Sequence, residues 1–256
     1  MNTQDLALLA LILSTSGSLM AAPLVTDRPD ATESSSVIAP NFFQLEVGVT
    51  SFEDSAGISG VESMGTLLRV GVIENLELRL GWGGYLESNP VTGANDAMLG
   101  IKYYLVAESG IRPEMALLLH TSLPVGDNAL TSDAFDPDFL LSCSHTLSDR
   151  FSFGYNVGAQ LESSQDESGH ESTASSALYS AALGYSINER MGAFIELFGA
   201  AGFSSDESPA SIDGGLTWLI NDDMQLDCYA GVGLNGDADE WFFGLGYSIR
   251  WPFENN

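Results

Sequence analysis

Basic residues are scarce in this chain of 256 residues. Eight lysines and arginines stand against 35 aspartates and glutamates, which gives a formal net charge of −27. Nucleic-acid binding depends on lysine and arginine side chains that neutralise phosphates, so this balance excludes nucleic acid as a partner. Two cysteines are too few for a disulfide framework, and their spacing indicates no metal site. We therefore expect no nucleic-acid partner, no metal and no cofactor.

Long hydrophobic runs are also missing. The chain is 45% hydrophobic, yet beyond residue 22 no apolar run approaches the ~20 residues that a membrane-spanning helix needs. Residues 1–22 contain one short apolar stretch, residues 6–13, followed by small residues, which predicts a signal peptide cleaved between Ser18 and Ala22. No lysine or arginine precedes the apolar stretch, and a buried N-terminal helix is the alternative.

What the chain has instead is alternation with a period of two from Phe42 onward. In the last segment the aromatic and aliphatic residues Trp241, Phe243 and Leu245 fall on one face, and Phe242 and Gly244 fall on the other. This pattern is typical of a strand with two different faces. The segments run to about ten residues, the length that a tilted strand needs to cross a bilayer.

Twelve such segments are predicted, near residues 42–51, 61–72, 76–86, 94–106, 111–124, 137–147, 150–163, 173–187, 190–203, 209–220, 224–234 and 240–253. Tight turns alternate with longer polar loops between them, as periplasmic turns and external loops do in bacterial outer-membrane barrels. We therefore predict an all-β fold, a closed antiparallel transmembrane barrel over residues 42–253. Residues 23–41 precede it as a plug or linker, and residues 254–256 follow it as a tail. The alternative is a soluble β-sandwich or lipocalin-like barrel.

The charged residues of the strands all share the polar face. A lysine or arginine that faces lipid at mid-bilayer costs about 2–4 kcal/mol, so the apolar face is expected outside and the polar face inside. The predicted lumen-lining, solute-contacting residues are Glu46, Arg69, Glu77, Arg79, Lys102, Glu114, Glu196, Asp213, Asp227 and Arg250.

The strand order divides these charges between two walls. Arg69, Arg79, Lys102 and Arg250 lie on neighbouring strands and form a basic wall, whereas the facing strands offer only acids, Glu162 included. Opposed walls create a transverse field that orients dipolar solutes. Alternatively, the charges pair with one another or with a plug and only satisfy a polar interior.

Residues 23–41 are not strand-like but carry charges, Asp27, Arg28, Asp30 and Glu33. Their acids enter the barrel beside the predicted basic wall. We expect this segment to fold into the periplasmic mouth as a plug that pairs with Arg69, Arg79 or Arg250. A disordered linker is the alternative.

The predicted external loops carry only acidic charges. They either keep the surface soluble or bind divalent cations weakly, because carboxylate oxygens suit Ca²⁺ and Mg²⁺. No loop has the regular spacing of a dedicated calcium site.

A barrel lipid hydrolase is the enzymatic alternative, and a structural or adhesive barrel that conducts nothing is another. Hydrolysis needs a serine activated by a histidine that a third polar group holds. His120 and Ser122 are two residues apart on one strand, as such a pair requires. They face the lumen, however, whereas a lipid-cleaving site must face the bilayer. We also expect no Asn or Asp of residues 137–147 to meet His120. We therefore predict no catalytic residues.

One stretch carries a family resemblance: Thr26-Asp27-Arg28-Pro29-Asp30-Ala31-Thr32-Glu33-Ser34, followed by Gln44-Leu45-Glu46-Val47-Gly48. It resembles the opening signature of the outer-membrane family labelled for the meta-pathway of phenol degradation. The resemblance implies an outer-membrane barrel for passive uptake of aromatic or other hydrophobic compounds.

The last strand, residues 247–253, resembles the aromatic C-terminal strand that barrel-assembly machinery recognises, although three residues follow Phe253. The expected partners are therefore this machinery, outer-membrane lipid with lipopolysaccharide, and a small-molecule solute.

Overall fold

The computed structural model describes residues 23–165, 171–204 and 207–253. The predicted signal peptide (1–22) and C-terminal tail (254–256) lie outside the described residues, as do parts of two acidic loops. Within the described part of the chain, no helix is long and apolar enough to cross a membrane.

Fourteen strands form one antiparallel sheet. They are β1 (Phe42–Glu53), β2 (Ser59–Ile73), β3 (Leu76–Trp82), β4 (Tyr85–Ser88), β5 (Thr92–Ala94), β6 (Ala97–Val106), β7 (Glu114–Leu123), β8 (Pro137–Thr146), β9 (Phe151–Gln165), β10 (Glu171–Asn188), β11 (Met191–Gly202), β12 (Ala210–Asn221), β13 (Met224–Gly233) and β14 (Trp241–Pro252). All of them except β4 and β5 make a ring of twelve, because β1 pairs with both β2 and β14.

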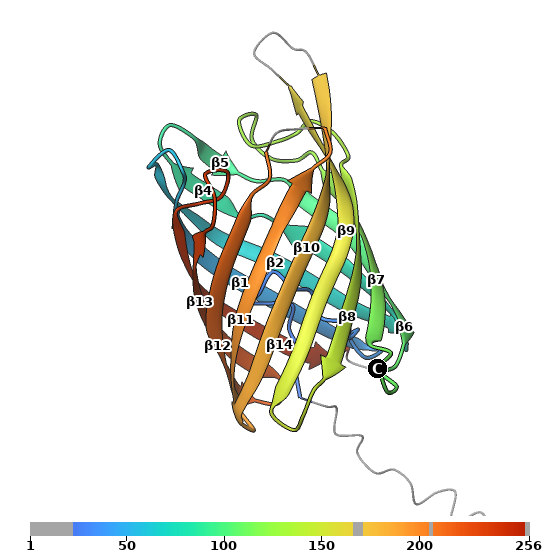
Figure 1. Cartoon of the computed structure of the whole chain (residues 1–256). Helices are drawn as coiled ribbons and strands as arrows, with labels where there is room; N and C mark the ends of the chain where they lie inside the picture. Colours follow the sequence, from blue (N-terminus) through green and yellow to red (C-terminus); the bar gives the residue numbers. More distant parts are fainter. Residues whose placement is uncertain (1–22, 166–170, 205–206, 254–256) are drawn as a thin grey trace, which may run out of the picture.

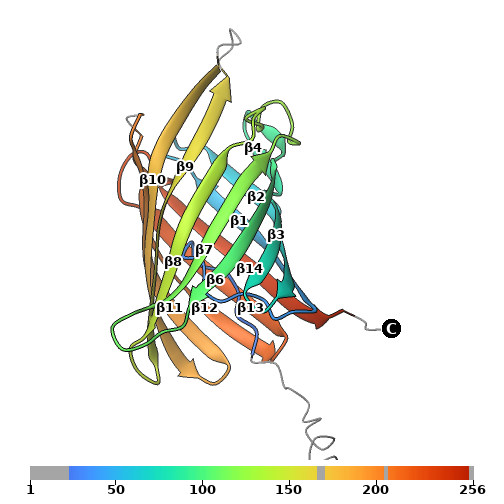
Figure 2. The same ribbon diagram turned by 90° about the vertical axis from the view of Figure 1, so that its right-hand side faces the viewer.

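The ring is a closed, tilted barrel (Figures 1 and 2). The closing pair β1–β14 runs in unbroken register from Phe42 opposite Pro252 to Glu53 opposite Trp241. Closure leaves no unpaired strand edge, which lipid could not solvate. The predicted twelve-stranded fold is therefore confirmed. We call its two ends the short-turn end and the long-loop end, after the connections that alternate between them.

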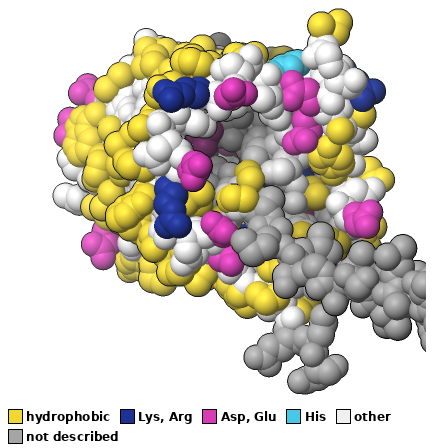
Figure 3. All heavy atoms as spheres, turned by 90° about the horizontal axis from the view of Figure 1, so that it is seen from below, with side chains coloured by type: hydrophobic (Ala, Val, Ile, Leu, Met, Phe, Trp, Pro, Cys, Tyr) yellow, Lys and Arg dark blue, Asp and Glu magenta, His cyan; other side chains and the backbone are white. Residues whose placement is uncertain are grey.

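The two faces of the strands are sorted as predicted. Leu78, Leu80 and Leu99 on the outside are 44%, 48% and 50% exposed, whereas Arg79 and Lys102 on the inside are 1% and 0% exposed. Viewed from the short-turn end, hydrophobic side chains surround the circumference and the centre is hollowed (Figure 3). This is an apolar exterior around a charged lumen, the arrangement of membrane barrels.

Three predicted strands differ by three residues or more at one end. The strand predicted over 94–106 begins at Ala97, as β6. The segment predicted over 76–86 is interrupted after Trp82, where Gly84 has a φ of 83°, a value that glycine adopts without strain. Beyond it, β4 continues the pairing with β2 and forms a small hairpin with β5. The strand predicted from residue 111 begins only at Glu114, because Pro113 has no N–H for the ladder.

Candidate functional site

Residues 23–41, hereafter the N-terminal segment, cross the lumen near the short-turn end (Figure 2). Among the described residues, hydrogen bonds or ion pairs tie the segment to every barrel strand except β12. The wall groups are Gln44, Glu46, Arg69, Glu77, Arg79, Lys102, Glu114, Ser142, Ser144, Asn156, Ser180, Glu196, Gln225, Asp227 and the Leu245 carbonyl. A linker without fixed contacts does not describe this segment.

Asp27 is the centre of the densest contacts. Its carboxylate lies 2.6 Å from Nη1 of Arg79, 2.8 Å from Nζ of Lys102 and 3.2 Å from Nη1 of Arg69. Burial disfavours the ionised form of Asp27, but the charges of Arg69, Lys102 and Arg79 outweigh it and hold the pKa well below its usual range. Asp27 therefore remains ionised and bound to three cations.

We call the three cations Arg69, Arg79 and Lys102, together with the carboxylates of the wall and the segment that surround them, the basic cluster. Arg69 donates to Glu77 at 2.8 Å and to Glu46 at 3.0 Å, and both oxygens of Glu33 accept from Arg79 at 2.8 Å. With Asp27, four carboxylates thus surround the cations of Arg69, Arg79 and Lys102. The wall predicted to be basic is neutralised where the segment lies, and of the two predicted alternatives, mutual pairing describes it.

Arg28 points away from Asp27 toward β13, β14 and β1, beside the basic cluster. Its Nη2 lies 3.3 Å from Oδ1 of Asp227, and its guanidinium carbon lies 5.8 Å from the centre of the Tyr229 ring. The guanidinium rests on Gly48 and Gly246, a cross-strand pair at which any Cβ would overlap it. A carboxylate and an aromatic face therefore hold this cation, while its backbone N–H donates to Glu46.

The acidic wall comprises Glu114, Glu196, Asp213 and Asp227, which reach the lumen from β7, β11, β12 and β13. Glu196 accepts from the Ala31 N–H at 2.7 Å and from the Thr32 hydroxyl, and Glu114 accepts from the Ser35 hydroxyl at 2.7 Å. These two acids bind the segment by hydrogen bonds instead of ion pairs.

The other two acids of this wall, Asp213 and Asp227, have fewer hydrogen-bond partners. Within the described residues, Oδ1 of Asp213 and Oδ2 of Asp227 are buried and meet no hydrogen-bond donor. Asp30 of the segment lies among them, and burial, followed by repulsion from Glu196, raises its pKa well above the usual range. The acidic wall thus retains buried carboxyl oxygens that the segment does not engage.

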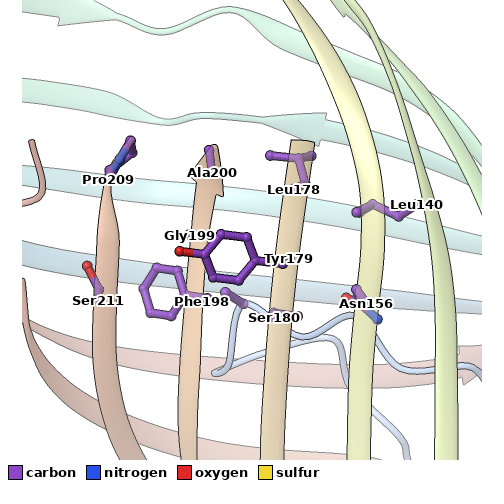
Figure 4. Close-up of a pocket in the computed structure, with 11 residues that line it drawn as sticks. Leu140, Asn156, Leu178, Tyr179, Ser180, Phe198, Gly199, Ala200, Pro209 and Ser211 are labelled. Carbon is purple, nitrogen blue, oxygen red and sulfur yellow. The ribbon is translucent and has the colours of Figure 1, made fainter. Parts of the chain in front are cut away.

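A cavity of about 270 Å³ opens on the long-loop side of Ala31. Figure 4 shows the residues that line it, with Phe198 projecting from β11 beside Ser180 and Ser211. Leu140 and Leu178 add apolar surface from β8 and β10. Phe198 and Phe242 were not predicted as site residues, although large aromatics on the otherwise polar face of glycine-rich strands were a usable signal.

Arg250, predicted to line the lumen, lies at its short-turn rim. It donates to Oδ1 of Asp223 at 2.7 Å, in the turn between β12 and β13, and its guanidinium carbon lies 5.4 Å from the centre of the Phe42 ring. Asp223 exposes half of its side chain. This pair therefore belongs to the solvent-facing rim and not to the basic cluster.

His120 does meet an aspartate, contrary to the prediction. Asp138 on β8 lies 3.0 Å from Nδ1 of His120, because the two residues are direct cross-strand partners. The Ser122 hydroxyl donates to the Ala134 carbonyl and accepts from the Asp136 N–H. The serine is thus engaged by the loop between β7 and β8. In the described part of the chain, no group of three His, Cys, Asp or Glu side chains is arranged to hold a metal ion.

Solved structures with a similar fold are bacterial outer-membrane proteins. A NanC porin is 12% identical, and the alignment covers 81% of this chain and 98% of the porin with a TM-score of 0.58. The P. putida toluene transporter TodX is 12% identical and aligns over 87% of this chain and 92% of its own, with a TM-score of 0.42. At this identity the NanC porin shows the fold alone, and TodX, with its lower TM-score, shows nothing further.

Among curated proteins, none matches the chain. A family model, in contrast, matches residues 26–251, from the N-terminal segment to the last strand. The protein has a porin-like barrel fold, and it belongs to the family described as "Putative MetA-pathway of phenol degradation".

Proposed function

We propose that the protein is a channel of the bacterial outer membrane for passive uptake of small solutes, aromatic and other hydrophobic compounds among them. The lumen supports this proposal most directly. A closed barrel with an apolar exterior surrounds charged and polar side chains and a cavity of about 270 Å³. Pores select solutes by the diameter, hydrogen-bonding groups and charges of such an interior.

The same proposal places the short-turn end in the periplasm and the long-loop end outside the cell. Export through the predicted signal peptide and insertion by the barrel-assembly machinery would bring the chain there. Lipid and lipopolysaccharide would then contact the exposed leucines and aromatics of the outer face, which include Trp218, Phe243 and Leu245.

The N-terminal segment acts in this proposal as a plug that restricts passage. Its hydrogen bonds and ion pairs reach wall groups around the lumen, from Glu46 on β1 to Asp227 on β13. A solute must pass beside the segment or displace it, so the contacts of Asp27 and Arg28 set the resistance of the channel.

Reconstitution of the full chain tests the proposal. In planar bilayers we expect discrete conductance steps, and in liposomes we expect swelling with small sugars and with aromatic solutes that cross protein-free lipid slowly. A folded protein, judged by heat-modifiable migration in gels, that gives neither conductance nor swelling would contradict channel function and favour a structural barrel.

A further inference from the structure

Aromatic rings line the acidic wall beside its carboxylates. The ring centres of Phe198 and Phe242 are 6.1 Å apart, and those of Phe242 and Tyr229 are also 6.1 Å apart. Phe242 reaches across β13 because Gly231 has no side chain there. A Cβ at Gly231 would overlap both the Phe242 ring and Cβ of Asp213. Asp213 therefore packs beside the edge of Phe242.

The lumen already contains one cation that is held by an aromatic ring and a carboxylate of this wall. Arg28 lies against the Tyr229 ring and pairs with Asp227 at 3.3 Å. A ring face attracts a cation through its quadrupole, and a carboxylate adds a charge-assisted hydrogen bond. The Arg28 contacts show which ligand chemistry this wall accepts, a flat or compact organic cation.

Asp213 has the same surroundings without a cation from the protein. It is 6% exposed, and in the part of the chain that the structure describes its buried Oδ1 meets no donor. Its cross-strand neighbour Glu196 is engaged by Ala31 and Thr32 of the segment. Ionising a buried carboxyl group is costly unless it is paired, so a cationic ligand group is the complement that would hold Asp213 in its charged form.

We propose that Asp213, Phe198 and Phe242 form a binding subsite for the charged group of a small organic cation, an ammonium or guanidinium on a short apolar body. Ser211, two residues from Asp213 on the same face of β12, lines the adjoining cavity with Leu140 and Leu178. The apolar body occupies that cavity of about 270 Å³. This inference deepens the proposed channel function and rests on it for the route by which the ligand arrives.

The surroundings of Asp213 suit an organic cation better than a metal ion. Ca²⁺ requires about 6–8 oxygen ligands and Mg²⁺ a near-ideal octahedron, whereas the Phe242 ring packs beside Asp213 and the Phe198 ring lies next to Phe242. Among the described residues, no arrangement of three or more acidic, histidine or cysteine side chains could hold a metal.

Calorimetry on the full chain in detergent micelles tests the subsite. The probes are benzylamine, which is cationic at neutral pH, and benzyl alcohol, its neutral counterpart of similar shape. We expect benzylamine to bind and Asp213→Asn to weaken it by about tenfold or more, the effect of losing one charge-assisted hydrogen bond. Glu162→Gln, which removes a lumen carboxylate farther toward the long-loop end, is the matched control and should leave benzylamine binding unchanged.

Equal binding of benzylamine to the parent and Asp213→Asn proteins would overturn the proposal, as would benzyl alcohol binding as tightly as benzylamine. If Asp213→Asn fails to fold, Phe242→Leu compared with Phe243→Leu decides, because Phe243 faces outward on the same strand. Only Phe242→Leu should weaken benzylamine, severalfold, and equal effects of both would overturn the proposal. Binding without conductance would refute the channel and keep the subsite, whereas conductance without benzylamine binding would refute the subsite alone.

Discussion

The basic cluster and the acidic wall face each other across one lumen, but they treat their charges differently. Around Asp27, the cations of Arg69, Arg79 and Lys102 each meet carboxylates at 2.6–3.5 Å. On the other side, Asp213 and Asp227 each retain a buried oxygen without a donor among the described residues. Both sides bind the N-terminal segment, the basic cluster through ion pairs and the acidic wall through hydrogen bonds, and only the acidic wall leaves buried carboxyl oxygens for a ligand to engage.

If the basic cluster anchors the N-terminal segment, Asp27→Asn should release the segment more than any other substitution considered below. Three buried cations lose their common partner, and breaking a buried ion pair costs about 3–5 kcal/mol. We expect the segment to leave the wall, which faster thiol labelling of Val37→Cys would report in a background where Cys143 and Cys228 are replaced by alanine.

The matched control for this loss is Asp223→Asn at the rim. It removes one of the partners of Arg250, a carboxylate that exposes half of its side chain, so solvent screening makes this loss smaller than that of a fully buried pair. Labelling of Val37→Cys should then stay at the parent rate. Equal labelling in both variants would show that the basic cluster does not anchor the segment.

Glu196→Ala tests the acidic wall and should have a smaller effect. It leaves the Ala31 N–H without its acceptor, which costs about 1–3 kcal/mol for a buried group, while the Thr32 hydroxyl keeps Ser180 as a partner. It also removes negative charge near Asp213. We expect a modest rise in Val37→Cys labelling, well below that of Asp27→Asn, and a rise at least as large would reverse the ranking of the two sides.

The smallest effect concerns pH, through Asp27 and Asp30. Burial and Glu196 raise the pKa of Asp30 when the segment is docked, so the docked state binds a proton that the released state has lost. Docking therefore strengthens as pH falls from the raised pKa toward the usual carboxyl range. Asp27 has the opposite sign, since its pKa is lowered, and its contribution is lost only below that range.

Single-channel recordings between neutral pH and about pH 5 should detect this window. Openings attributed to release of the segment should become rarer as the pH falls. Asp30→Asn should weaken this trend and leave the part due to Glu33, whose pKa burial also raises. Openings that become more frequent on acidification, or a trend of equal size in Asp30→Asn, would contradict the assignment to Asp30.

Much of this comparison was predictable from the sequence, because strand parity determines which residues face a lumen. The twelve strands and their inward and outward faces follow from the period-two pattern, and the two walls follow from strand order. Parity does not give the contacts made across the lumen. Those depend on how strands are staggered and on how the segment folds, so the position of Asp27 among three cations could not be read from spacing.

The failures have the same physical origin. Asp138 meets His120 because the register of β7 and β8 makes them direct partners, and the length of the loop between them does not determine that register. Arg250 lies at the short-turn end, and its pairing with Asp223 of the β12–β13 turn is a local contact that strand parity does not give. The break at Gly84 needed a positive φ that the sequence only permits.

The central claim is that the N-terminal segment, held by the basic cluster, restricts a conducting lumen. Deletion of residues 24–38 tests it most directly, with single-channel conductance in planar bilayers compared between the full chain and the deletion. We predict a larger unitary conductance for the deletion, with heat-modifiable migration confirming that the barrel remains folded. An unchanged conductance in a folded barrel would contradict the claim.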